Sequence, residues 1–176
     1  MKDLMMTESI MTYSTAKGFG NSAYAMLSNP ARLNLPEDSS LFLGFHLLLG
    51  FSVELYLKSV LQFSGWSEKA LRSSDIRHDL KNLLHSVSKH NFDCGGAVQL
   101  VDVLHDNHKT YEFRYSKDGS TYRVVPPSHL FAALSVLDQN VDVLVGASVS
   151  EGVIPSGGWV LPFELSTWRL NGIRNV

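Results

Sequence analysis

The run from Leu41 to Ser64 is almost wholly apolar, and it constrains the fold more than any other part of the chain. It is long enough to raise the question of a membrane span, for which about 20 apolar residues suffice. However, His46, Glu54 and Lys58 would lie in its middle, where each charge costs roughly 2.5–3.5 kcal/mol on insertion scales. The run therefore predicts a buried central helix that ends at Gly65, and no membrane span.

The polar residues of this run lie on one helical face. Steps of four residues join His46, Gly50, Glu54, Lys58 and Gln62, and residues four apart are neighbours on a helix surface. Taken alone, Glu54 and Lys58 predict an ion pair at the edge of the bundle, worth about 0.3–0.5 kcal/mol. The same stripe can instead face a functional partner, and both interpretations stay open.

Composition narrows the class of protein. The chain has 176 residues, of which 44% are hydrophobic and 18% charged, with a formal net charge of −2; we expect one globular domain. A weakly acidic chain is not attracted to polyanions as a whole, so nucleic acid would have to meet a local cluster of Arg and Lys. Cys94 is the single cysteine, and the first residues lack the apolar core of a secretory signal, so we expect a cytoplasmic protein.

Apolar spacing predicts further helices over about 10–28, 80–87, 97–109 and 128–145. In the helix over 97–109, the residues Val98, Val101, Leu104 and His108 are expected to share the apolar face. The domain is expected to cover residues 1–151. Residues 152–176 are expected to form an irregular C-terminal arm that packs on the bundle or on a partner.

The stretch "TYEFRYSKDGSTYRVVPP" has a different period. Aromatic residues at 111, 113 and 115 alternate with charged ones, and Asp118-Gly119 suits a type I′ turn. The pattern predicts a small β-hairpin in which Arg114 faces Arg123. The two guanidinium groups then either support the hairpin through Glu112 or form an anion site for phosphate oxygens.

His78 and Asp79 begin the helix over 80–87. Asp79 is suited to cap that helix, and His78 either packs beside the cap or acts as a general acid or base. No Walker loop, G-x-S-x-G elbow or H-E-x-x-H motif is present in the sequence. His105 and His108 share a helix, but no acidic cluster or cysteine is assigned to them. We expect neither a metal nor a cofactor.

In this order, the motifs resemble the HEPN family, helical domains named for higher eukaryotes and prokaryotes. The resemblance covers about residues 41–145 and rests on the following residues: Glu54, Lys58, Gly65, His78-Asp79-Leu80, Tyr111 and Arg114-Tyr115. It implies a mainly α-helical, up-and-down bundle of about five helices that forms a homodimer, with its site near the dimer groove. It also implies an antitoxin or a nucleotidyltransferase as partner, because family members occur in toxin and defence systems and beside nucleotidyltransferases.

The ribonucleases of the family resemble one another in an Arg followed, after a short gap, by a His, and they cleave RNA without a metal. Arg72 with His78, and Arg123 with His129, have this spacing. Such a pair would stabilise charge and serve as the base for attack by the RNA 2′-hydroxyl.

Two functions follow from the sequence. The first is an HEPN-like protein that binds RNA or a nucleotide and acts as a metal-independent endoribonuclease. His78 or His129 would then be the acid or base, with Arg114 and Arg123 as phosphate ligands. The second is a non-catalytic module for dimerisation or protein interaction, in which the same polar residues only hold the bundle together.

Overall fold

The computed structural model describes residues 2–115, 117–155 and 158–175, and it is mainly helical, as predicted. The elements in chain order are α1 (Lys2–Ser28), η1 (Pro30–Asn34), α2 (Ser39–Phe63), α3 (Glu68–Leu71), α4 (Leu80–Ser88), α5 (Gly95–Lys109), β1 (Thr121–Tyr122), α6 (Pro127–Val145), α7 (Ala147–Ser150), η2 (Phe163–Leu165) and β2 (Arg174–Asn175). Five of the α-helices, α1, α2, α4, α5 and α6, have nine residues or more.

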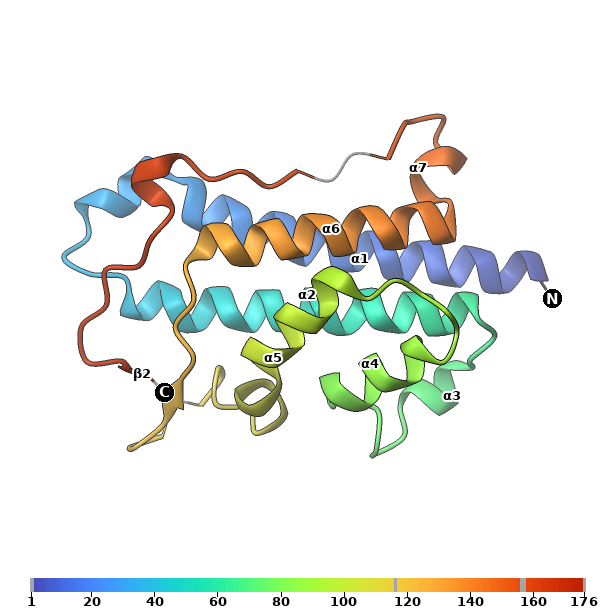
Figure 1. Ribbon diagram of the computed structural model, residues 1–176, viewed down its shortest axis with the longest axis horizontal. Coiled ribbons are helices and arrows are strands. Elements are labelled where there is room, and N and C mark those ends of the chain that lie inside the picture. The colour runs from blue at the N-terminus through green and yellow to red at the C-terminus, as the bar shows by residue number, and fades with distance from the viewer. Residues whose placement is uncertain (1, 116, 156–157, 176) are drawn as a thin grey trace.

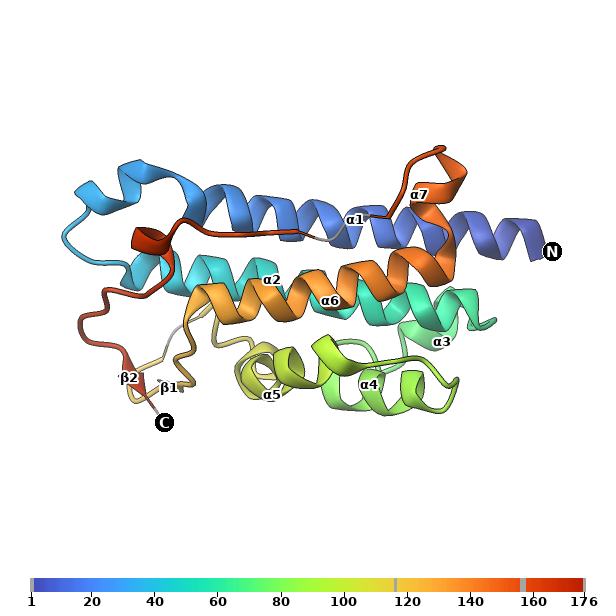
Figure 2. The same cartoon turned by 45° about the horizontal axis from the view of Figure 1, so that its top comes forward.

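The apolar run forms α2, and α2 is the central helix. The long helices α1, α2 and α6 lie side by side, with α4 and α5 against another side of α2 (Figures 1 and 2). The four helices that contact α2 are α1, α4, α5 and α6. Among the described residues α2 alone is long and apolar enough to cross a membrane, but its burial by four neighbours is typical of a core helix in a soluble protein.

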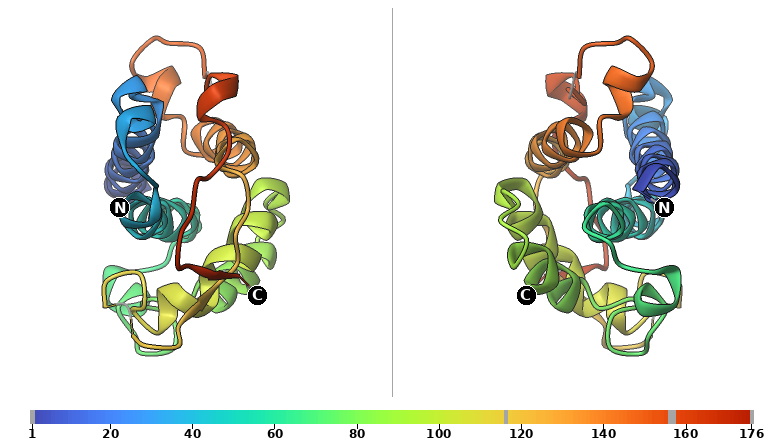
Figure 3. Two further views of the ribbon diagram at one scale, coloured as in Figure 1. Left: turned by 90° about the vertical axis from the view of Figure 1, so that its left-hand side faces the viewer. Right: turned by 90° about the vertical axis from the view of Figure 1, so that its right-hand side faces the viewer.

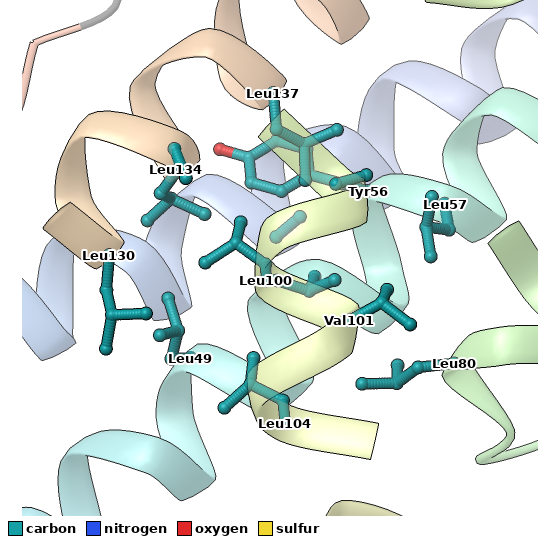
Figure 4. Packing of buried hydrophobic residues seen from close by; sticks show 14 of the residues in the cluster. Leu49, Tyr56, Leu57, Leu80, Leu100, Val101, Leu104, Leu130, Leu134 and Leu137 are labelled. Atoms are coloured by element: carbon teal, nitrogen blue, oxygen red, sulfur yellow. The ribbon is translucent and has the colours of Figure 1, made fainter. Parts of the chain in front are cut away.

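The main core lies where α2, α5 and α6 meet. Figure 4 shows the side chains of this region pointing toward one another: Leu49, Tyr56 and Leu57 from α2, Leu100, Val101 and Leu104 from α5, and Leu130, Leu134 and Leu137 from α6. Each fully buried side chain of this kind contributes about 1.5–3 kcal/mol. Gly96 allows α5 to approach α6 closely, because a Cβ there would lie 2.2 Å from the Ala133 carbonyl oxygen.

The buried face of α5 differs from the predicted one. Val98 is 53% exposed, whereas Leu100, Leu104, His105 and His108 are buried. Val101, Leu104 and His108 lie on the buried face as predicted, and Val98 alone does not. Leu100 and His105 complete that face, so two histidines point into the bundle.

The predicted β-hairpin is wrong for the described residues. The chain after α5 forms a turn, and β1 pairs in parallel with β2, with Thr121 opposite Arg174. The reason is the end of α5: the Tyr111 N–H donates to the His108 carbonyl (3.3 Å) and the Glu112 N–H to that of Asn107 (2.9 Å). These two bonds form a Schellman motif, so the backbone of the expected first strand closes the helix instead.

Residues 158–175 run back along the bundle and cross the end at which α2 begins (Figures 1 and 3). Trp159 donates its indole N–H to Asn21 of α1 (2.9 Å), and Trp168 donates to the Val125 carbonyl (2.9 Å). At residue 169 the arm meets Asp38, the N-cap residue of α2. The arm thus packs on the bundle of its own chain.

Asp38 is fully buried between two arginines, and we call Arg32, Asp38 and Arg169 the Asp38 clamp. Arg32 donates from Nε to Oδ1 (3.1 Å) and from Nη2 to Oδ2 (2.8 Å). Arg169 donates its backbone N–H to Oδ2 (2.9 Å) and its Nη2 to Oδ1 (2.9 Å). Burial favours protonated Asp38, but these hydrogen bonds outweigh it and lower its pKa to about 2. Asp38 is therefore ionised, and the clamp joins the arm to the start of α2 through charged groups.

Candidate functional site

Glu54, on the polar stripe of α2, is only 4% exposed and is the centre of a polar cluster. Its Oε1 accepts from Lys58 Nζ (2.6 Å), and its Oε2 accepts from His108 Nε2 (2.8 Å) and His78 Nδ1 (3.1 Å). We call these four residues the Glu54 cluster. An ionised carboxylate can only accept hydrogen bonds, so the facing nitrogens of both imidazoles carry protons.

The carboxylate of Glu54 is ionised despite its burial. Burial alone would raise its pKa, but hydrogen bonds from His108, Lys58 and His78 and the charge of Lys58 outweigh it. Together they lower the pKa of Glu54 to about 2. The cluster is thus held by a negative charge at neutral pH.

Local sequence positions two of the three partners of Glu54. Lys58 lies one helical turn further on and also donates to the Arg77 carbonyl (2.9 Å), which ties the loop before α4 to α2. His78 precedes Asp79, the N-cap of α4, whose Oδ1 accepts from the Asn82 N–H (2.9 Å). Both sequence neighbours of His78 are therefore fixed, Arg77 by Lys58 and Asp79 by the cap, and this holds His78 against Glu54.

His108 reaches Glu54 because Gly50 has no side chain. A Cβ on Gly50 would lie 2.4 Å from His108 Nδ1, far inside van der Waals contact. Gly50 stands one turn before Glu54 on the same stripe of α2. The helix thus opens a place for the imidazole of α5 directly beside the carboxylate.

Asp79 forms a second polar group next to the cluster. Its Oδ2 pairs with Lys109 Nζ (2.7 Å), and its Oδ1 lies 3.6 Å from His105 Nδ1. Burial opposes ionisation of Asp79, but the bonds from Lys109 and Asn82 outweigh it and lower its pKa. Lys109 is therefore held at the same end of α5 as His108.

Tyr111 has a backbone conformation that is unusual for its residue type. Its φ is 63°, at the position of the Schellman motif where glycine is usual. Its ring lies edge to face with His78, with 5.7 Å between ring centroids. Arg114 stacks over this ring at 5.1 Å and over Phe51 at 4.7 Å. The strained turn thus places an aromatic ring and a guanidinium next to the histidine.

His78 is the histidine of the cluster that reaches the surface. Its side chain is 22% exposed, whereas those of Glu54 and His108 are buried. It lines a depression of about 330 Å³ together with Ser74, Arg77, Asp79, Lys109 and Tyr111. Lys109 is paired there with the carboxylate of Asp79, and Arg77 adds a further positive charge, which favours an anionic ligand.

The structure separates the residues predicted from sequence into two groups. Six of them meet at or beside the Glu54 cluster: Glu54, Lys58, His78, Asp79, Tyr111 and Arg114. The others lie apart from it in their contacts: Arg72 pairs with Glu68, Arg123 pairs with Asp102, and His129 and Tyr115 are exposed.

The absence of the hairpin explains why Arg114 and Arg123 do not form the anion site that we considered. Arg114 stacks on aromatic rings, and Arg123 pairs with Asp102 of α5. Likewise, the described contacts of Arg72 are with Glu68 and do not include His78. Neither Arg–His pair is therefore joined by a contact among the described residues.

The site residues predicted from sequence do not include His108 and Lys109. His108 was expected on the apolar face of its helix, and His105 follows Val101 at helical spacing, so both histidines continue the apolar stripe. A histidine on a buried stripe needs a polar partner, and so did Glu54. Since each of these buried groups needs a partner, the two together would have predicted a contact between Glu54 of α2 and a histidine of α5.

Comparisons of the chain with models of protein families, with curated proteins and with solved structures give no match. The function is therefore argued from the arrangement of these side chains. The central element of that arrangement is a buried carboxylate that holds two imidazoles, one of which borders a depression with positive charge.

Proposed function

We propose that this chain is an HEPN-like protein that binds RNA or a nucleotide in the depression beside His78, and that it cleaves RNA there without a metal. One observation carries the proposal. Glu54 Oε2 holds Nδ1 of His78 at 3.1 Å, while the same ring borders the surface depression. A buried carboxylate that orients an imidazole at a surface site is the usual arrangement of a general base.

The hydrogen bond decides which nitrogen of His78 does the chemistry. With the proton on Nδ1 held by Glu54, the lone pair lies on Nε2, which makes no hydrogen bond with the described residues. Nε2 then takes the proton from a ribose 2′-hydroxyl as its oxygen attacks the phosphorus. The bond from phosphorus to the 5′-oxygen breaks, and the imidazolium returns the proton to that oxygen. The products are a 2′,3′-cyclic phosphate and a 5′-hydroxyl.

Positive groups around His78 support binding of the phosphate. Arg77 and Lys109 line the depression, and Arg114 lies against the Tyr111 ring at its edge. Guanidinium and ammonium groups stabilise the charge that develops on the phosphate oxygens. The Tyr111 ring is 40% exposed and offers a face on which a base can stack.

Incubation of the protein with single-stranded RNA in excess chelator tests this proposal. We expect cleavage by the parent protein and at least a hundredfold slower cleavage by His78→Ala and by Glu54→Gln, because general base catalysis contributes about 10²–10⁴. His85→Ala is the matched control, since His85 is exposed on α4 and outside the depression.

Two results would contradict the proposed chemistry. One is the absence of cleavage by the parent protein. The other is cleavage that persists in His78→Ala; loss in His129→Ala would then assign the reaction to the second histidine predicted from sequence. Analysis of the product ends for cyclic phosphate adds a readout that a contaminating nuclease of another mechanism does not reproduce.

The alternative, a non-catalytic dimerisation or interaction module, is favoured by a different observation. The arm exposes Ile154, Val160 and Phe163, the last of which is 91% exposed. Exposed apolar groups of this kind are common at protein interfaces. A dimer whose dissociation constant rises at least tenfold in Phe163→Ser, together with no RNA cleavage by the parent, would support this alternative. A homodimer and an antitoxin or nucleotidyltransferase partner stay predictions.

A further inference from the structure

We propose that Glu54, His78 and His108 form a binding site for one divalent transition-metal ion of the Zn²⁺ type, and that this ion inhibits the site. The three side chains offer one ligand atom each, and these atoms lie within 4.8 Å of one another. They come from α2, from the loop before α4 and from α5. Metal binding is inferred from this arrangement alone, whereas inhibition rests on the proposed function.

The two carboxylate oxygens of Glu54 have different partners, and only Oε2 faces the two imidazoles. Oε1 is occupied by Lys58, which is itself anchored to the Arg77 carbonyl. Oε2 faces both imidazoles. In metal sites, residues that hydrogen-bond to a ligand orient it toward the ion. Lys58 would thus direct Glu54 to bind through Oε2 only.

The distances between ligand atoms suit a small ion. Donors that each bind zinc at about 2.0–2.2 Å in a tetrahedral site lie roughly 3.4 Å apart. Oε2 is 2.8 Å from His108 Nε2 and 3.1 Å from His78 Nδ1. Only the two imidazoles must approach each other, and their ring centroids are 6.3 Å apart. His78 is the partly exposed member, so a rotation of its side chain would make this adjustment.

The donor set selects the class of ion. Two imidazole nitrogens and one carboxylate oxygen suit Zn²⁺, Co²⁺ and their neighbours better than Ca²⁺ or Mg²⁺, which prefer oxygen ligands. Three protein ligands leave a fourth position open. His78 borders the depression, so water or an added ligand would enter from that side.

Metal binding changes the proton positions of His78. Without the ion, Nδ1 carries a proton that Glu54 accepts. The ion needs the lone pair of Nδ1, so the proton of the neutral ring moves to Nε2. The proposed reaction uses the lone pair of Nε2 as the base. An ion at this site therefore removes the base and inhibits RNA cleavage.

Titration of the metal-free protein with Zn²⁺ by calorimetry tests the site, and Co²⁺ supplies a visible absorption spectrum that reports its coordination. We expect one equivalent of each ion to bind, and binding to weaken at least tenfold in Glu54→Gln, His78→Ala and His108→Gln. His85→Ala should bind within twofold of the parent. Circular dichroism shows which variants are folded. His78 is the least buried of the three ligands, so we expect His78→Ala to fold and to test the site even if the other two variants unfold.

Binding that is equally strong in His78→Ala and the parent would assign the ion to surface histidines and overturn the site, as would the absence of binding at micromolar Zn²⁺. RNA cleavage is then measured with and without Zn²⁺. Metal binding by a protein that does not cleave RNA would leave the site in place and reject the proposed function. Cleavage that is unchanged at saturating Zn²⁺ would reject the inhibition and keep the site.

Discussion

Asp38 and Glu54 are two buried carboxylates on the same helix, one at the N-cap of α2 and one in its middle. Both have a pKa near 2, because bonds from positive or polar partners outweigh burial. Asp38 is held by Arg32 and Arg169, whose guanidinium groups stay charged at any pH that the protein survives. Glu54 is held by one lysine and two imidazoles. The partners, and not the carboxylates, distinguish the two sites.

This difference separates a structural role from a chemical one. The partners of Asp38 have no proton to exchange near neutral pH, so the clamp can only hold the arm. Two of the partners of Glu54 are imidazoles, which can carry a proton on either ring nitrogen, and one of them reaches the surface. A strongly lowered carboxylate pKa therefore does not by itself indicate a functional site.

Breaking the Asp38 clamp should have the largest effect on stability. Asp38→Ala leaves the buried guanidinium of Arg32 without its carboxylate. We expect the free energy of unfolding to fall by about 3–5 kcal/mol, as for other buried ion pairs that lose one partner. Urea denaturation measures it. Glu164→Ala, an exposed change on the same arm, should stay within about 0.5 kcal/mol; an equal loss in both variants would mean that the clamp has no special role.

His46 lies between the two carboxylates on α2 and sharpens the comparison, because it is buried without a charged partner. Burial lowers its pKa to about 4, from the usual 6.5. The unfolded chain therefore takes up a proton first, and stability present above pH 6.5 is lost as the pH falls toward 4. We expect a loss of about 2 kcal/mol between pH 7 and pH 5.

Urea denaturation at the two pH values measures this loss, with His46→Phe as the variant that lacks the titrating group. Asp38 and Glu54 stay ionised over this range, so they do not contribute. The variant should lose about 2 kcal/mol less than the parent between the two pH values. Identical pH dependence of the two proteins would show that His46 does not stay neutral in the folded state.

Gly50→Ala should break the Glu54 cluster and leave the Asp38 clamp intact. The new Cβ would lie 2.4 Å from His108 Nδ1 and displace the imidazole. We expect a loss of about 1–2 kcal/mol in the free energy of unfolding. Gly44→Ala is a matched control on the same helix, because its Cβ would meet only Met26 at an ordinary 3.5 Å. Alanine favours the helix there by up to about 1 kcal/mol, so a loss in both variants would contradict the assigned contact.

Tyr111→Gly should have the smallest effect on stability, and with the opposite sign. Glycine adopts the observed φ of 63° without strain, which favours the folded state by about 1 kcal/mol. The same change removes the ring beside His78, so we expect weaker RNA binding in a filter assay. Tyr111→Phe keeps the ring and should bind like the parent. A glycine variant less stable than the parent would show that ring packing outweighs the backbone strain.

Much of the fold could be predicted from sequence. The apolar run gave the central helix almost to the residue, and Gly65, with a φ of 97°, ends it as expected. The hairpin was wrong because the alternation at 111–115 has two physical explanations. A strand would place residues 111, 113 and 115 on one face, but in the turn that closes α5 only Phe113 is buried, and Tyr111 and Tyr115 are exposed. The sequence does not say that the later arm supplies the partner of β1.

Most residues of the site could be predicted, because several of them are close in sequence. Glu54 with Lys58, and His78 with Asp79, are close in sequence, so spacing alone suggested them. His108 joins Glu54 from 54 residues away. That contact depends on the orientation of α5 and on the gap at Gly50, and both follow from packing between helices. The resemblance to the HEPN family stays a prediction.

The Asp38 clamp also has a consequence for how the chain is made. Arg169 follows Asp38 by 131 residues. At a synthesis rate of about 5–20 residues per second, Asp38 and Arg32 wait on the order of ten seconds for their last charged partner. During translation, Asp38 is therefore paired with Arg32 alone, and it lacks the hydrogen bonds from Arg169 until the arm leaves the ribosome. A chain that ends before Arg169 would leave the start of α2 without these contacts and more exposed, and proteases cleave such exposed segments more readily.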